Sequence, residues 1–121
     1  MNQTNSSQLA QSTLESYRGK KRLLLIFAPA ETDPAYQKQL ELLDGHTEAC
    51  NARDIVIARL FADGESNFAG TQSASSLPLE LREEFGIAED EFALLLVDKA
   101  GDVQLRTDEP TALEEIFELV D

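Results

Sequence analysis

The sequence predicts an α/β domain with a mixed four-stranded sheet flanked by helices on both faces. Three observations lead to this prediction. The chain contains three continuous apolar runs, which are typical of strands buried on both faces. Segments with helical periodicity or helix-capping signals separate these runs and end the chain. A short alternating segment follows the third run after a loop of hairpin length, which indicates an antiparallel edge strand.

The first half of the chain is expected to form a strand, a helix and a second strand. The two strands are Arg22–Ala28 and Ile55–Phe61. The helix should begin at Asp33 and Pro34, because aspartate suits the N-cap and proline suits the first helical position. Its inward face is formed by Tyr36, Leu40, Leu43, Thr47 and Cys50. We therefore expect one helix through Cys50, weakened by about 1 kcal/mol at Gly45, and two parallel strands joined by a right-handed crossover.

The next segment is expected to form a loop and a second helix. Residues 62–76 are mostly small and polar, so we expect a surface loop there. The helix should run from Leu77 or Pro78 to Phe85 and end at Gly86, which suits the position after a helix. This helix precedes the hairpin.

The last segment is expected to form an antiparallel hairpin and a third helix. The hairpin strands are Phe92–Val97 and Val103–Arg106. The helix is expected over Ala112–Val120, where Thr111 would be the N-cap and Glu114 would complete a capping box. The order βαβ, helix, ββα is that of a thioredoxin-like core. We expect residues 14–121 to form this single domain and the polar residues 1–13 to be a flexible N-terminal segment.

Composition and charge exclude several classes of protein. The chain has 121 residues, a formal net charge of −13 and one cysteine. A lone cysteine cannot form an intramolecular disulfide, and so acidic a surface does not suit nucleic acid or anionic lipid. No secretory signal or bilayer-spanning run is present, so we expect a soluble, cytoplasmic protein. Residues 77–121 hold 14 acidic and 3 basic residues, which makes this final third a candidate surface for contact with another protein.

Two segments resemble a known family. One runs from Lys21 to Pro29 (KRLLLIFAP) and continues to Asp33-Pro34 and Gln37; the other runs from Phe92 to Arg106 (FALLLVDKAGDVQLR). Together they resemble the uncharacterised thioredoxin-like family called P-DUDES, which occurs in bacteria and in vertebrate sushi-repeat and coiled-coil matrix proteins. The resemblance covers roughly residues 14–121. It implies a thioredoxin-like fold and names no reaction.

A wider resemblance to peroxiredoxins and thioredoxins allows their catalytic residues to be checked. Peroxiredoxins have proline, then threonine or serine four residues later, then the reactive cysteine three residues further on. Counted from Pro29, these positions hold Asp33 and Tyr36. The loop after the first strand has no Cys-x-x-Cys motif, and no proline stands near Phe92, where a thioredoxin has its cis-proline. We therefore assign no catalytic residue.

Several residues are nevertheless candidates for a binding site. The loop after the first strand is a common place for ligands in such folds, and it offers Glu31, Thr32 and Asp33, with Tyr36 alongside. Arg106 ends the fourth strand among acidic residues; it would bind an anion or form a salt bridge to Asp108 or Glu109.

Cysteine, histidine and paired aspartates are further residues with possible chemistry. Cys50 falls on the apolar side of its helix and is expected to be a core residue; a redox role requires that it be exposed. His46 has no second histidine or cysteine at ligand spacing, so we expect a solvated residue rather than a zinc ligand. Asp98 and Asp102 flank a turn, but their spacing differs from that of a calcium-binding EF-hand loop.

The function expected from these observations is that of a non-catalytic thioredoxin-like domain that binds another protein and uses no cofactor. Two alternatives stay open. The first is a thiol redox protein or sensor that works through Cys50. The second is a site for a small molecule or metal at Glu31, Asp33 and Tyr36.

Overall fold

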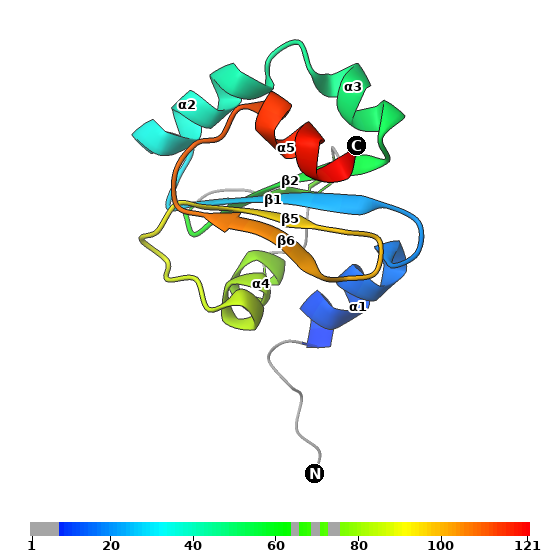
Figure 1. The fold of residues 1–121 in the computed structure, drawn as a ribbon. Coiled ribbons are helices and arrows are strands. Elements are labelled where there is room, and N and C mark those ends of the chain that lie inside the picture. The colour runs from blue at the N-terminus through cyan, green and yellow to red at the C-terminus, as the bar shows by residue number, and fades with distance from the viewer. Residues whose placement is uncertain (1–7, 64–65, 69–70, 73–75) are drawn as a thin grey trace.

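The computed structural model describes residues 8–63, 66–68, 71–72 and 76–121. Figure 1 shows a sheet with helices on both sides, so the α/β fold class predicted from the sequence is confirmed. The strands are β1 (Arg22–Ala28), β2 (Ile55–Phe61), β3 (Asn67–Phe68), β4 (Thr71–Gln72), β5 (Ala93–Val97) and β6 (Val103–Thr107). The helices are α1 (Gln8–Tyr17), α2 (Pro34–Leu43), α3 (Thr47–Ala52), α4 (Leu77–Phe85) and α5 (Leu113–Val120).

The strands form one mixed sheet in the order β4-β3-β2-β1-β5-β6. β1 and β2 are parallel, in a register that runs from Arg22 opposite Ile55 to Ala28 opposite Phe61. The other neighbouring pairs are antiparallel. All of β5 and all of β1 after Arg22 are buried, as expected for continuous apolar strands. The carboxyl ends of β1 and β2 therefore lie side by side.

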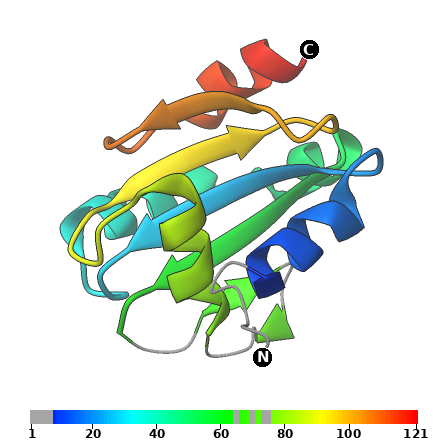
Figure 2. The same ribbon diagram turned by 90° about the horizontal axis from the view of Figure 1, so that it is seen from below.

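Helices cover both faces of the sheet and create two hydrophobic cores. α1 and α4 lie below the sheet in Figure 1, and α2, α3 and α5 lie above it. Figure 2 shows the lower face, with α1 and α4 in front of the strands. Alternate residues of β1 point into the two cores: Leu23, Leu25 and Phe27 contribute to the lower one, and Leu24 and Ile26 to the upper one. Among the described residues, no helix is long and apolar enough to cross a membrane.

The single helix predicted through Cys50 is wrong, because the structure divides it into α2 and α3. The division follows Leu43, where Gly45 has a φ of +82°. This left-handed conformation suits glycine, which has no β-carbon. The chain therefore turns between the helices, and Cys50 still reaches the upper core from α3.

The surface loop predicted over residues 62–76 is also wrong in part. β3 and β4 lie inside this segment and pair as a short antiparallel hairpin, and β3 pairs with β2 at Ala58 and Arg59. The hairpin is held through Phe68, which is buried and stacks on Tyr17 with ring centroids 5.4 Å apart. Phe68 is the one aromatic residue of a segment that is otherwise small and polar, and its burial explains why the sheet is wider than predicted.

α1 was not predicted from the sequence. Ala10, Leu14 and Tyr17 lie one helical turn apart and pack on the lower core. Residues 8–13, assigned to the flexible segment, belong to this helix. The rest of that assignment, residues 1–7, lies outside the described residues.

The capping box predicted for the last helix is wrong. Ala112 occupies the N-cap position of α5, and no side chain caps the helix there. Thr111 instead contacts Gln39, a fully buried residue of α2. The Gln39 amide oxygen accepts a hydrogen bond from the Thr111 backbone N–H at 2.8 Å, and its amide nitrogen donates to the Thr111 carbonyl at 3.0 Å. Gln39 thus joins α2 to the chain that enters α5.

Candidate functional site

The loop after β1 contains four of the candidate residues, and the structure divides them. Asp33 caps α2, because its Oδ2 accepts a hydrogen bond from the backbone N–H of Tyr36 at 3.1 Å. Thr32 is exposed, and neither it nor Asp33 lines the hollow that lies beside Tyr36. Glu31 and Tyr36 line this hollow together with Arg59 of β2. Of the three residues predicted to form a ligand site, the structure thus brings Glu31 and Tyr36 to one hollow, and Asp33 caps α2.

Tyr36 lies in the first turn of α2, and its ring is buried. The ring meets that of Phe61 edge to face, with centroids 4.9 Å apart. Burial raises the pKa of the Tyr36 hydroxyl, the charge of Arg59 lowers it, and the charge of Glu31 raises it. The hydroxyl is therefore protonated at neutral pH and is available as a hydrogen-bond donor.

Two adjoining hollows share Arg59 and Asn67, and we call them together the Arg59 groove. The smaller has a volume of about 180 Å³ and the larger about 510 Å³. Arg59 and Asn67 face each other across the β2–β3 register. The remaining lining residues are Glu31, Tyr36, Phe61, Ser66 and Gln72 in the smaller hollow, and Thr47, Cys50, Asn51, Ile55, Val56 and Ile57 in the larger.

The Arg59 groove presents hydrogen-bond donors from neighbouring strands. Arg59 is exposed, and the described residues include no ion pair to it. Asn67 and Gln72 add side-chain amides from β3 and β4, which pair directly opposite each other. An arginine fork, a tyrosine hydroxyl and two amides can hold a carboxylate or a carbonyl group. Sequence reasoning missed Arg59 because its role depends on β3 and β4, which were not predicted.

Cys50 lines the larger hollow of the groove and is buried. Its side chain is only 1% exposed. Burial raises the pKa of its thiol, and the charge of Arg53 lowers it in part, so the thiolate is scarce at neutral pH. The exposure that a redox role requires is therefore not met.

Arg106 lies outside the Arg59 groove and pairs with neither Asp108 nor Glu109 in the described structure. Its guanidinium donates to the carbonyls of Phe85 and Gly86, at the end of α4. A cation at the carboxyl end of a helix stabilises its unpaired carbonyls. The salt bridge expected from the sequence is thus replaced by a helix cap, made possible because β6 lies beside the end of α4.

Asp98 and His46 also have partners within the structure. Asp98 accepts hydrogen bonds from the backbone N–H groups of Ala100 and Asp102 and from the Gln104 side chain, and these bonds lower the pKa of its carboxyl. His46 Nε2 lies 3.6 Å from Glu114 Oε2. The described residues contain no group of three His, Cys, Asp or Glu side chains placed to hold a metal ion.

Arg82 is a second residue that sequence reasoning missed. It is 2% exposed and donates hydrogen bonds to the carbonyls of Ala28, at 2.7 Å, and Ala88. Burial lowers the pKa of its guanidinium, and Glu89, Glu91 and Asp90 raise it. The hydrogen bond from Arg82 to Ala28 thus connects α4 to the carboxyl end of β1. Arg82 follows Leu81 on the buried side of α4. This position within the predicted helix could have indicated from the sequence that Arg82 is buried.

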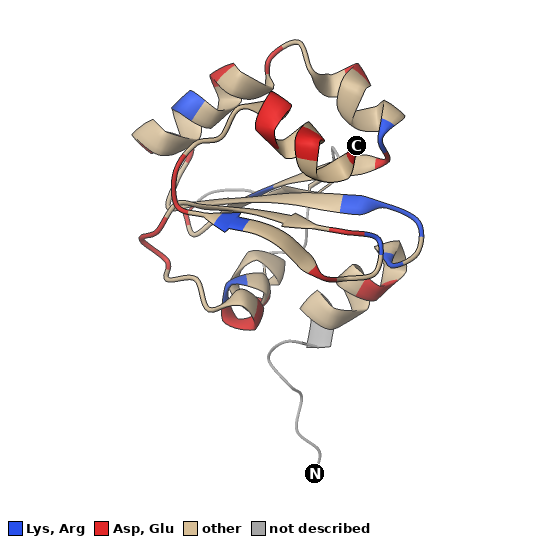
Figure 3. Cartoon of the chain, in the orientation of Figure 1, with Lys and Arg blue, Asp and Glu red and all other residues tan. Residues whose placement is uncertain are grey.

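The acidic final third occupies two surfaces of the molecule. Figure 3 shows acidic residues on α4 below the sheet and on α5 above it. Glu83 and Glu84 belong to α4, and Glu114 and Glu115 belong to α5; all four are exposed. Because the sheet separates the two helices, a flat partner cannot contact both groups at once.

Comparison with known families and proteins gives consistent matches. The family model described as Domain of unknown function (DUF4174) matches residues 13–121. The chain is 29% identical to Sushi repeat-containing protein SRPX2 of Xenopus laevis, over 89% of this chain and 24% of that protein. Identity to the Homo sapiens protein of the same name is also 29%, over 93% of this chain and 25% of that protein. The chain thus spans about a quarter of the length of these relatives, and the resemblance to sushi-repeat proteins is confirmed.

Solved structures of peroxiredoxins have the same fold. The reduced 2-Cys peroxiredoxin of Plasmodium vivax superposes with a TM-score of 0.68 at 18% identity, covering 89% of this chain and 80% of that one. Mycobacterium tuberculosis AhpC gives a TM-score of 0.66 at 14% identity, covering 88% of this chain and 71% of that one. The thioredoxin-like fold is therefore confirmed. The single cysteine is buried, so the catalytic cysteines of that fold are absent.

Proposed function

This chain belongs to the family described as Domain of unknown function (DUF4174), and from that premise we propose that it is a non-catalytic thioredoxin-like domain that acts by binding another protein. The observation that carries the proposal is the side chain in the first turn of α2. Tyr36 stands there, with a buried ring and a protonated hydroxyl, where the resemblance to peroxiredoxins places a reactive cysteine. A protonated hydroxyl binds by donating a hydrogen bond and is a poor nucleophile.

The Arg59 groove is the contact surface that we propose. Its donors are Arg59, Tyr36, Asn67 and Gln72, which suit a carboxylate or backbone carbonyls of a bound segment. The apolar side chains of Ile55 and Ile57 continue the groove beside α3. A polar end and an apolar end together favour a peptide segment over a small ion.

The size of the relatives supports a binding role. The chain corresponds to about a quarter of the sushi repeat-containing proteins that it matches. In those relatives the matching segment is one part of a longer protein. Function must be argued from the site and not from the fold, and the peroxiredoxin cysteine position is occupied here by Tyr36, which favours binding over catalysis.

Site-specific cross-linking tests the proposal. A photoreactive amino acid at Gln72, an exposed residue of the groove, should link the domain to a recurrent protein in extracts of its source organism. Arg59→Glu should abolish the cross-link, because it reverses the charge at the centre of the groove. Lys38→Glu is the matched control, since Lys38 is exposed on α2 and lies outside the groove. Cross-links that persist in Arg59→Glu, or turnover of peroxide or disulfide by the wild-type chain, would contradict the proposal.

The acidic final third offers two further candidate contact surfaces for a basic partner, one on α4 and one on α5. The two exposed groups can be separated by double substitutions: Glu83→Gln with Glu84→Gln on α4, and Glu114→Gln with Glu115→Gln on α5. Loss of a salt-sensitive partner in one variant only would assign the contact to that helix. A set of bound proteins that neither double variant changes would count against these surfaces.

A further inference from the structure

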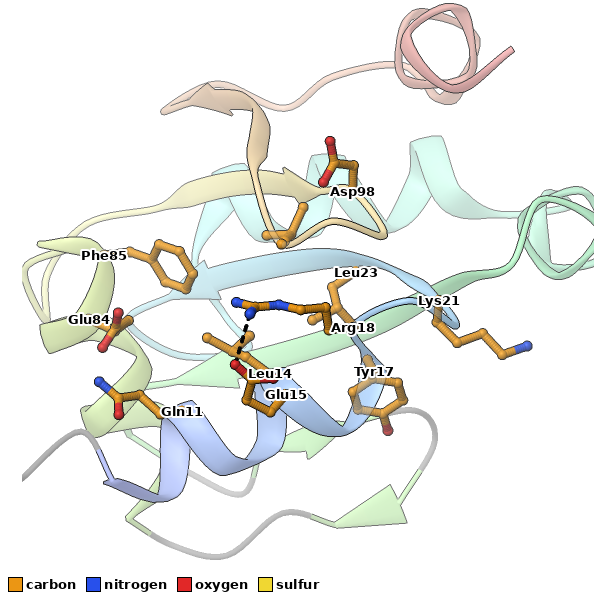
Figure 4. Close-up of a pocket in the computed structure, with 12 residues that line it drawn as sticks. Gln11, Leu14, Glu15, Tyr17, Arg18, Lys21, Leu23, Glu84, Phe85 and Asp98 are labelled. Atoms are coloured by element: carbon orange, nitrogen blue, oxygen red, sulfur yellow. Dashed lines mark ion pairs between the residues drawn. The ribbon is translucent and has the colours of Figure 1, made fainter.

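A hollow of about 360 Å³ opens between α1, α4 and the sheet, on the face opposite to the Arg59 groove. Figure 4 shows its side chains, which come from helices and strands far apart in the sequence. We call it the Arg18 pocket. Its volume lies at the lower end of the range of about 300–1,000 Å³ that is usual for small-molecule sites. It is lined by Gln11, Leu14, Glu15, Tyr17, Arg18, Lys21, Leu23, Glu84, Phe85, Val97, Asp98 and Gly101.

The floor of the Arg18 pocket is apolar. Leu23 of β1 and Val97 of β5 are buried beneath it. Leu14 of α1 and Phe85 of α4 pack against the same core and are only partly buried. These last two side chains leave apolar surface in contact with water, and an apolar ligand group that covers it is favoured by the hydrophobic effect.

The Arg18 guanidinium supplies positive charge at the pocket and lies near the apolar side chains of Leu14 and Leu23 (Figure 4). Its guanidinium lies 3.0 Å from a Glu15 carboxylate oxygen, but the two side chains are 53% and 60% exposed. An exposed pair of this kind contributes little to stability, so a second carboxylate can replace Glu15 at small cost. The end of α1 is held against the β5–β6 turn, because the Gly19 N–H donates to the Lys99 carbonyl at 2.7 Å.

Gly101 of the β5–β6 turn lies against the Arg18 side chain. A β-carbon built at residue 101 would lie 3.0 Å from two nitrogens of the Arg18 guanidinium, so a side chain there would shift this flexible group by a few tenths of an ångström. The glycine therefore leaves room for the guanidinium beside the turn, where it also pairs with Glu15.

Two of the other charged side chains at the pocket already have partners, and a third is negative and repels a multiply charged anion. Lys21 pairs with Asp54 at 3.5 Å. Asp98 is held by the turn through its hydrogen bonds to backbone N–H groups. Glu84, on α4, adds negative charge to the wall. A ligand with a single negative charge therefore suits this site better than a phosphate dianion.

We propose that the Arg18 pocket binds a small amphipathic carboxylic acid. The ligand carboxylate takes the place of Glu15 on the Arg18 guanidinium, whose planar fork matches a carboxylate. The apolar part of the ligand lies on Leu14 and Phe85. The site is independent of the Arg59 groove and of the protein contacts proposed there.

Titration of the full chain with octanoate, 3-phenylpropionate and octanol tests the proposal. Binding is measured by calorimetry and by changes in the NMR chemical shifts of the backbone amides in β1 and β5, around Leu23 and Val97. Both acids should bind, and octanol should bind about tenfold more weakly because it lacks the charged bonds to Arg18. Arg18→Gln should lower octanoate affinity about tenfold. Glu15→Gln should raise octanoate affinity, since it removes the competing carboxylate. Lys20→Gln, next to the pocket but not lining it, is the matched control and should change nothing.

Three results would overturn the proposal. They are failure of both acids to bind at millimolar concentration, equal affinity for octanol and octanoate, and unchanged affinity for octanoate in Glu15→Gln. The Glu15→Gln variant keeps Arg18 and alters only an exposed side chain, so its outcome decides the question even where Arg18→Gln fails to fold.

Discussion

Replacement of Gln39 by leucine should destabilise the protein far more than a surface glutamine would. Gln39 is 0% exposed, and its side-chain amide makes two hydrogen bonds to the backbone of Thr111. Leucine has a similar volume but no polar atoms. The Gln39→Leu variant therefore leaves the Thr111 N–H and carbonyl without their partners, while the packing of α2 changes little.

The magnitude follows from the number of groups left unpaired. Each buried backbone group that loses its partner costs about 1–3 kcal/mol. Thr111 is partly exposed, so water can reach it in part and the lower half of that range applies. We expect the free energy of unfolding to fall by about 2–4 kcal/mol, which corresponds to a decrease of roughly 10 °C in Tm for a domain of this size.

Urea denaturation followed by circular dichroism measures this change. Gln37→Leu is the matched control, because Gln37 is exposed on the same helix and donates one hydrogen bond to the Glu31 carbonyl. The control should lose less than about 1 kcal/mol. If Gln39→Leu is no less stable than Gln37→Leu, the Gln39–Thr111 connection does not stabilise the fold and the reasoning is refuted.

Three further predictions concern other parts of the chain. Gly45→Ala should destabilise by roughly 1 kcal/mol in urea, because Gly45 has a φ of +82°; an unchanged midpoint would contradict this. Cys50 should react with a thiol reagent in urea but not in the native protein, since it is 1% exposed; rapid native reaction would revive the redox hypothesis. Hydrogen bonds and ion pairs hold the pKa values of Asp54, Asp98 and Asp121 below the ordinary value of 3.8. Each carboxylate therefore stabilises the fold above that value, and this stabilisation is lost as the pH falls through the lowered pKa. The Tm should drop below about pH 4, and Asp98→Asn should make that drop smaller; an equally steep drop would assign it to other groups.

The strands and helices that were predicted well are those whose signal is local. β1 has the predicted bounds because a continuous apolar run specifies a buried strand without reference to its neighbours. β2 also has the predicted bounds, although its apolar run is interrupted by Arg59, which is exposed. α4 was predicted because Gly86, at a φ of +69°, ends it as expected. β3 and β4 were missed because two-residue strands have no periodicity, and they depend on pairing with β2.

The candidate site was predicted only in part for a similar reason. Glu31 and Tyr36 follow β1 directly, so the position of the loop was enough to single them out. Arg59 and Asn67 become neighbours of Tyr36 only after β3 has paired with β2. Arg106 was assigned to the nearest acids in sequence, but the structure places it at the end of α4. A charged side chain binds what is nearest in space, which sequence distance does not specify.

By itself, the sequence determined the fold class, the core strands and the absence of cysteines from the positions where thioredoxins and peroxiredoxins have them, because apolar runs, helix caps and residue identity are properties of short segments. Tertiary structure alone decided which side chains meet. The Arg59 groove is formed by side chains from three strands and two helices, and Arg18 lies against Gly101 of a distant turn. Tertiary structure also divided the acidic final third between opposite faces. These arrangements arise from the pairing and layering of elements distant in sequence, which hydrophobic burial stabilises only once the whole domain has formed.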